Sequence, residues 1–128
     1  MKHVLVAVAW PYANGPLHLG HMAGCYLPAD IFARYHRLKG NQVLMVSGSD
    51  MHGTPIMVTA QQEGAEPEEV ALRYHEMNSR SIEQMGISFD LFTHTHTPEH
   101  QAVAQEIIER LDDAGYIEPR TTTAPYDP

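Results

Sequence analysis

The chain has 128 residues, 43% of them hydrophobic, which allows one domain or part of one with a modest core. A formal net charge of −8 argues against a domain that binds nucleic acid unaided, because phosphate contacts supply most of that affinity. The single cysteine, Cys25, excludes an internal disulfide and a multi-cysteine zinc site within this sequence. No apolar run approaches the roughly 20 residues of a membrane span, and no secretory signal pattern is present, so we expect a cytoplasmic domain.

The first half of the sequence predicts a strand, a helix and a second strand. Residues 3–9 are Val-rich and almost uninterruptedly apolar, as in a parallel strand covered on both faces. Residues 10–17 contain two prolines and an Asn-Gly pair and should form a loop. A helix over residues 19–39 should end at Gly40, before a second buried strand at residues 42–48. This order predicts a right-handed βαβ unit.

Two proline-containing sites refine this pattern. Pro28 lies inside the first predicted helix and should kink it, because proline lacks the amide hydrogen that the helix needs. Thr54 and Pro55 offer an N-cap and a first helical residue, so a short helix is predicted from there to about Gly64.

The remainder is predicted to be mostly helical. A helix over residues 67–85 should bury the face formed by Val70, Tyr74, Met77 and Met85. A short extended piece at residues 89–92 precedes a last helix that begins at Thr97-Pro98. The buried face of that helix should consist of Val103, Ile107, Leu111 and Ala114. Residues 120–128 form a polar, proline-containing tail.

The most informative segment is the start of the first helix, with the pattern His18-Leu19-Gly20-His21. Two imidazoles three positions apart lie close together in the first turn of a helix. That turn also presents unpaired backbone N–H groups and the positive end of the helix dipole. Such a site favours anions, of which phosphate is the usual one. Histidine donors can also stabilise the charge that develops on a phosphate under attack.

The flanking segments turn this pattern into a family resemblance. Residues 9–15 read Ala-Trp-Pro-Tyr-Ala-Asn-Gly, and residues 48–55 read Gly-Ser-Asp-Met-His-Gly-Thr-Pro. With the HxGH pattern between them, they resemble the class I aminoacyl-tRNA synthetases, and among these the methionyl-tRNA synthetase family. The resemblance implies an α/β fold, a Rossmann-like parallel sheet with flanking helices. Residues 1–128 would be a partial catalytic nucleotide-binding domain, the first half of a class I synthetase catalytic domain.

The resemblance also implies an activity and its residues. The family activates L-methionine with ATP, which carries Mg²⁺, and transfers the product to tRNA. His18 and His21 would contact the phosphates and act in catalysis, and Gly20 and Gly24 would let ATP approach. Methionine would be bound by four residues: Ala9, Trp10, Tyr12 and Asp50. The family more often has an aliphatic residue where this chain has Trp10, so only the backbone role carries over there.

Several parts of the family pattern are absent from the sequence. The KMSKS lysine loop, the inserted zinc subdomain, the second half of the nucleotide fold and the anticodon-binding domain are not found, and Asp127 lies about where the insertion would begin. We therefore expect the main tRNA contacts to lie outside this chain and the isolated chain to be weakly active or inactive. We also expect it to associate with itself or with a complementary half, because its sheet should leave an edge uncovered.

Other interpretations remain open. A small HxGH nucleotidyltransferase would share the histidine pair, and a non-catalytic relative could bind methionine, a nucleotide or a partner. His52 fits a structural role and an active-site role equally. His94, His96 and His100 form an HxHxxxH run, but Pro98 interferes with a shared helix face and no further ligand completes the set, so no metal site is predicted.

Overall fold

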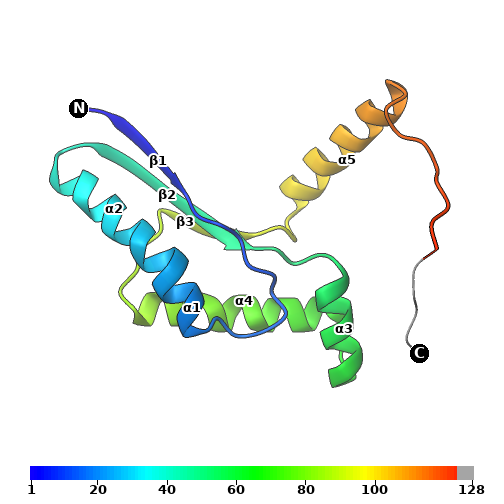
Figure 1. Ribbon diagram of the computed structural model, residues 1–128, viewed down its shortest axis with the longest axis horizontal. Helices are drawn as coiled ribbons and strands as arrows, with labels where there is room; N and C mark the ends of the chain where they lie inside the picture. The colour runs from blue at the N-terminus through cyan, green and yellow to red at the C-terminus, as the bar shows by residue number, and fades with distance from the viewer. Residues whose placement is uncertain (124–128) are drawn as a thin grey trace. The chain divides into compact units, whose positions relative to one another are not determined.

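The computed structural model describes residues 1–123 and divides the chain into two compact units, Met1–His96 and Thr97–Pro128 (Figure 1). The first unit contains the sheet, and the described part of the second, up to residue 123, contains one helix. The sequence expectations for the end of the tail, including Asp127, lie outside the described residues.

The sheet has three parallel strands in the order β1-β2-β3. They are β1 (His3–Ala7), β2 (Gln42–Ser49) and β3 (Leu91–His94). The predicted α/β fold with a parallel sheet is therefore confirmed. β1 is two residues shorter than expected, although Val8 N still donates to Val46 O over 2.9 Å.

One long helical segment connects β1 to β2. It consists of α1 (Leu19–His21), a π-helical turn η1 (Met22–Tyr26) and α2 (Leu27–Leu38). The amide of Leu27 donates to Met22 O, one residue further back than in an α-helix. The π-turn ends two residues before Pro28, which has no amide hydrogen to continue the α-helical pattern. The expected interruption at Pro28 thus takes the form of a widened turn.

Two helices, α3 (Thr54–Glu63) and α4 (Pro67–Gln84), connect β2 to β3. The predicted N-cap of α3 was Thr54, but the structure has Gly53 in this position. The helix ends at Gly64, which adopts the left-handed conformation. The φ angle of Gly53 is 110°, which an L-residue rarely adopts. This backbone conformation shifts the start of the helix by one residue.

The buried face of α4 differs from the prediction. The helix buries Val70, Ala71, Asn78 and Ile82, and Tyr74 is partly buried. Met77 and Met85 are exposed, so their predicted burial is wrong. The buried face is rotated about the helix axis relative to the predicted one. Asn78 faces the core in place of its neighbour Met77. A polar side chain occupies the core where a methionine was expected.

The main core lies on one face of the sheet, under α2 and the end of α4. It contains Val8, Met22, Tyr26, Ala33, Met45, Ile82 and Ile87. Burial raises the pKa of Tyr26 to about 12, with a smaller contribution from Cys25 and an opposing one from Ser47. The other face carries Leu5, Leu44 and Leu91, each more than half exposed. The prediction that the first strand is covered on both faces is therefore wrong for β1 in this chain.

The second unit contains α5 (Pro98–Asp113). Its N-cap is Thr97, as predicted, and the Thr97 hydroxyl accepts the amide of His100 over 3.1 Å. The helix buries none of its residues, so the predicted burial of its apolar face is wrong for this unit. Within residues 1–123, no helix is long and apolar enough to cross a membrane.

Candidate active site

The two histidines of the HxGH pattern lie against each other at the start of α1. Their ring centroids are 3.9 Å apart and the ring planes are inclined by 35°. His18 is the N-cap of the helix and His21 is its N3 residue, and each side chain bonds to the backbone of the other end of this turn. The sequence prediction that the two imidazoles lie together is therefore supported by the geometry.

The backbone fixes which ring nitrogens carry hydrogen. Nδ1 of His18 accepts the amide of Gly20 over 3.1 Å, and Nδ1 of His21 accepts the amide of His18 over 3.2 Å. A ring nitrogen that accepts a hydrogen bond carries no proton, so the proton of each neutral imidazole lies on Nε2. Both side chains can therefore donate from Nε2 to an anion. The amide of Gly20 already donates to His18 and is not available to an anion. The Nε2–H groups of the two imidazoles are available in its place.

Asp50 is held at the end of β2 by backbone pairing with the loop after β1. The amide of Asp50 donates to Pro11 O over 2.8 Å, and its carbonyl accepts the amide of Ala13 over 2.8 Å. Tyr12 and Asp50 consequently form an isolated parallel bridge that continues the pairing of β1 with β2. This bridge brings together two residues that are 38 positions apart in the sequence. The backbone pairing thus places an acidic and an aromatic residue next to each other at the carboxyl ends of the strands, where doubly wound sheets bind ligands.

The carboxylate of Asp50 is partly buried and has two neighbours that can donate to it. Its Oδ1 accepts the amide of His52 over 3.2 Å and lies 3.5 Å from the hydroxyl of Thr95. That hydroxyl also accepts the amide of Met51 over 2.8 Å, so its one proton is free to point at Asp50. The side chain of His52 is exposed, with its ring 5.4 Å from that of His96. Nothing in this geometry distinguishes the two roles left open for His52.

Ala9 and Trp10 extend from the end of β1 and are both exposed. The buried hydroxyl of Ser47 lies 3.2 Å from Val8 O and 3.3 Å from Ala9 O and holds this turn. The ring of Trp10 lies over Gly48, where a Cβ atom would be 2.7 Å from two ring carbons. Glycine at this position therefore makes room for the indole. Because Leu44 and Gly48 alternate with inward-facing residues, the indole lies on the open face of the sheet.

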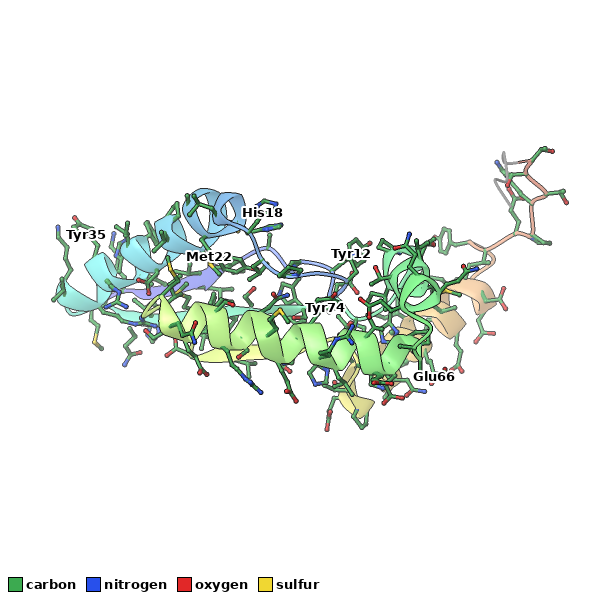
Figure 2. The ribbon with its side chains drawn as sticks, turned by 90° about the horizontal axis from the view of Figure 1, so that it is seen from below. Tyr12, His18, Met22, Tyr35, Glu66 and Tyr74 are labelled. Atoms are coloured by element: carbon green, nitrogen blue, oxygen red, sulfur yellow. The ribbon has the colours of Figure 1, made fainter. Side chains whose placement is uncertain are left out.

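A pocket of about 310 Å³ opens beside these elements. Its lining includes three residues singled out from the sequence, Trp10, Tyr12 and His21, together with the loop that runs from Asn14 to Leu17. His18 adjoins it through the contact with His21, and Asp50 adjoins it through the bridge to Tyr12. Figure 2 shows Tyr12 and His18 along the segment that connects β1 to the helix.

The two glycines of the pattern differ in their surroundings. A Cβ atom at Gly20 would lie 2.9 Å from Cε1 of His18 and would displace that ring. A Cβ atom at Gly24 would meet nothing within 4 Å, and the residue is exposed. Gly20 is therefore needed by the histidine pair itself, whereas Gly24 leaves an open surface on the helix.

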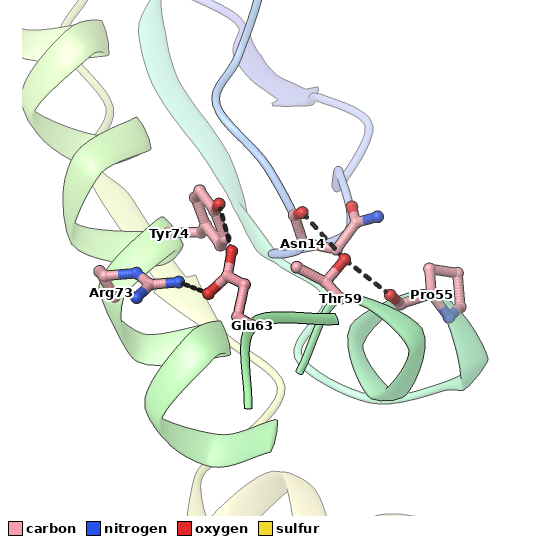
Figure 3. Close-up of polar contacts among 6 residues, drawn as sticks. All are labelled: Asn14, Pro55, Thr59, Glu63, Arg73 and Tyr74. Carbon is pink, nitrogen blue, oxygen red and sulfur yellow. Dashed lines mark hydrogen bonds and ion pairs between the residues drawn. The ribbon is translucent and has the colours of Figure 1, made fainter. Parts of the chain in front are cut away.

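The loop before His18 is held by two side chains that sequence reasoning missed. The hydroxyl of Thr59 in α3 lies 3.3 Å from Asn14 O and 3.1 Å from Pro55 O and shares its one proton between them (Figure 3). The side chain of Asn78 in α4 bonds to the backbone on both sides of Pro16. Helices α3 and α4 are joined to each other through Glu63, which accepts from Arg73 and Tyr74 (Figure 3). No signal in the sequence indicated Asn78, because the predicted buried face of its helix contained Met77 in place of Asn78.

A second pair of histidines, His75 and His94, lies next to Ser49 at the end of β2. Nδ1 of His75 is 2.9 Å from the hydroxyl of Ser49, and its ring packs on Phe92 and His94. Burial lowers the pKa of His75, and His94 lowers it further against a smaller opposing effect of Glu76. His96 pairs instead with Glu68 over 3.2 Å. In the described part of the chain, no three His, Cys, Asp or Glu side chains are grouped to hold a metal ion.

The three-stranded parallel sheet with its flanking helices matches part of the Rossmann-like catalytic domain of solved class I aminoacyl-tRNA synthetases. The sequence model described as tRNA synthetases class I (M) matches residues 4–128, and the chain belongs to that family.

Individual relatives agree with this assignment. The chain is 62% identical over 121 residues to the methionine–tRNA ligase of Thermomicrobium roseum, covering 94% of this chain and 21% of that protein. It is 56% identical over 124 residues to the methionine–tRNA ligase of a Roseiflexus species, covering 97% and 21%. It also matches the Mycobacterium tuberculosis methionyl-tRNA synthetase solved with methionyl-adenylate, with a TM-score of 0.83 and 32% identity over 90% of this chain and 22% of that one. The chain thus spans about a fifth of the length of the curated relatives it matches.

Proposed function

We propose that this chain forms the part of a methionine–tRNA ligase that binds ATP and methionine for activation. The reaction is the attack of the methionine carboxylate on the α-phosphorus of ATP. A carboxylate oxygen–phosphorus bond forms, the bond to the bridging oxygen breaks, and pyrophosphate leaves with the electron pair. The observation that carries the proposal is the histidine pair with both Nε2–H donors available beside a pocket that Tyr12 lines.

In this proposal, His18 and His21 stabilise charge and do not transfer protons. Negative charge increases on the phosphate oxygens as the carboxylate attacks, and donors already aimed at them need no reorganisation. The backbone amides that bind both Nδ1 atoms keep each imidazole in the donor tautomer at Nε2. Gly24 would let the nucleotide lie close to the helix, since no side chain covers that surface.

Asp50 is the proposed partner of the α-ammonium group of methionine. It lies at the carboxyl end of β2, where the backbone of Tyr12 is paired with it. The backbone at Ala9 and Trp10 supplies further polar groups, and Tyr12 supplies an aromatic surface for the thioether. Contacts of sulfur with aromatic rings are favourable by about 0.3–1.5 kcal/mol.

The remaining components are expected to come from outside this chain. Mg²⁺ enters with ATP as part of the substrate, and the tRNA is bound mainly by other domains, in keeping with the net charge of −8. The proposed setting of the reaction is the cytoplasm. The apolar residues Leu5, Leu44 and Leu91 on the open sheet face give the chain a surface for a complementary part of the enzyme or for a second copy.

A chimera tests the proposed activity. Residues 1–128 replace the matching segment of the Thermomicrobium roseum ligase, and methionine-dependent ATP–pyrophosphate exchange is measured. We expect exchange at a rate close to that of the parent. A chimera that folds and binds methionine or nucleotide without exchange would instead identify a non-catalytic binding relative. Exchange without methionine would identify a different nucleotidyltransferase.

The isolated chain offers a second test. We expect little or no exchange from it, and self-association at micromolar concentration in size-exclusion chromatography with light scattering. A compact monomer of 14.3 kDa would contradict the expected association.

A further inference from the structure

Asn78 is a fully buried polar side chain in the middle of α4, with 0% of its surface exposed. Its Oδ1 accepts the amide of Leu17 over 2.9 Å, and its Nδ2 donates to Gly15 O over 3.2 Å. The two bonds bracket Pro16, which has no amide hydrogen of its own. One side chain thus holds both ends of a three-residue segment that lies more than sixty positions away in the sequence.

This segment has few other hydrogen bonds, although the side chain of Leu17 also packs against the main core. In the described part of the chain, residues 14–17 make no hydrogen bond from backbone to backbone. The other side-chain hydrogen bond to this segment comes from the hydroxyl of Thr59, whose proton is shared between Asn14 O and Pro55 O of its own helix. The loop is therefore positioned by side chains of α3 and α4, and Asn78 supplies two of these bonds.

The residue after Leu17 is His18, the N-cap of α1. The Nδ1 atoms of His18 and His21 bond to amides of the same turn, so the directions of both rings follow the backbone at this point. A displacement of Leu17 would be transmitted to both rings at once. Asp50 is held separately, by backbone bonds to Pro11 and Ala13.

We propose that Asn78 is the positioning residue of the histidine pair: it fixes the loop before His18 so that both imidazoles face the nucleotide. This role rests on the function proposed above, but the clamp on the loop can be measured without it. Asn78 touches no substrate and acts through the backbone of Gly15 and Leu17. Its burial is therefore explained by the site and not by apolar packing.

The first experiment measures amide hydrogen exchange in the 128-residue chain. Asn78→Leu keeps the size of the side chain and removes both bonds, and Ile82→Val is a matched control in the same buried stripe. We expect Asn78→Leu to speed exchange of the Leu17 amide about tenfold or more relative to the Val8 amide, because a buried hydrogen bond is lost. Ile82→Val should change both amides by the same factor. Asn78→Asp keeps an acceptor for Leu17 and should restore much of its protection.

The second experiment measures kinetics in the chimera with the Thermomicrobium roseum ligase. Asn78→Leu should lower kcat for pyrophosphate exchange about 10- to 100-fold, because small misplacements of reacting groups are costly. The KM for methionine should stay close to the wild-type value, since Asp50 is held by other bonds. Ile82→Val should leave kcat nearly unchanged.

The outcomes separate the two proposals. Unchanged relative protection of Leu17 in Asn78→Leu overturns the clamp, and a loss of kcat no larger than in Ile82→Val overturns its role in positioning the histidines. An inactive wild-type chimera contradicts the proposed function, while the exchange of Leu17 still decides whether Asn78 holds the loop.

Discussion

The two halves of the candidate site are built in different ways. The half that contains Asp50 continues the sheet, since backbone bonds to Pro11 and Ala13 extend the pairing of β1 with β2. The half that contains the histidines lies beyond the sheet. The side chains of Asn78 and Thr59 bond to the loop before His18, and the two imidazoles cap the first turn of α1.

This difference shows which changes each half tolerates. Backbone pairing does not depend on side-chain identity, so the place of Asp50 should withstand substitution of its neighbours. The histidine half depends on particular side chains: Asn78 and Thr59 hold the loop, and the loop sets the positions of the imidazoles. We therefore expect substitutions near the histidines to act on the rate of the reaction and substitutions at Asp50 to act on methionine binding.

The largest effect is expected at His21. In the chimera, His21→Ala should lower kcat for pyrophosphate exchange by about 100-fold or more, because a preorganised donor to the transition state is lost. Steady-state kinetics with circular dichroism of the fold measure this. His3→Ala, at the amino end of β1, is the control and should keep full activity. A normal kcat with a lowered melting temperature would make His21 a structural residue.

Asp50 is expected to give the next largest effect, in the other half of the site. Asp50→Asn keeps the size of the side chain and removes its charge, so methionine binding should weaken about 10- to 100-fold while ATP binding stays the same. Calorimetry with each ligand on the chimera measures both. Asp113→Asn in α5 serves as the control. Equal methionine affinity in wild type and Asp50→Asn would remove Asp50 from the binding site.

Gly24 allows stability and function to be separated within the histidine half. Gly24→Ala has open space and lies inside the helical segment, so it should stabilise the fold by about 0.5–1 kcal/mol. If the nucleotide lies against this surface, the same variant should raise the KM for ATP several-fold. Thermal unfolding of the chain and kinetics of the chimera test the two parts. A more stable variant with an unchanged KM for ATP would show that the nucleotide does not approach Gly24.

The smallest effect concerns pH and the partly buried side chain of His75, which contacts Ser49. The pKa of His75 is lowered from its ordinary value of 6.5, chiefly by burial. His75 therefore binds a proton more readily in the unfolded chain than in the folded one. Its effect on the free energy of unfolding is absent above pH 6.5, and this free energy decreases as the pH falls below that value. Urea unfolding at pH 7.5 and pH 5.5 should show a smaller decrease in His75→Gln than in wild type. An equal decrease in both would assign the pH effect to other groups.

The sequence predicts much of the fold because the relevant signals are local. Apolar runs mark β1 and β2, and the glycines at 40, 64 and 86 mark helix ends where the structure has positive φ angles. Asp50 follows its strand directly, so its place at the end of the sheet could be predicted. The nearness of His18 and His21 follows from their spacing in one helical turn. These features need no knowledge of distant contacts.

The supporting contacts could not be predicted in this way. Helical periodicity favoured Met77 as a core residue, but Asn78 lies inward because its amide bonds to a loop that is distant in the sequence. The fit between Trp10 and Gly48 likewise depends on the register of two strands. The sequence predicts an uncovered edge for the sheet of a partial domain, but the run at β1 predicts a strand that is buried on both faces. Tertiary contacts decide each of these positions.

The position of Trp10 gives this chain an intrinsic fluorescence probe. It is the only tryptophan in the sequence; its indole lies on Gly48, and the residue is also part of the lining of the pocket that includes His21 and Tyr12. The emission of an indole changes when water near it is displaced. Fluorescence of the unlabelled chain therefore follows events at the pocket, without interference from tryptophans elsewhere in this segment.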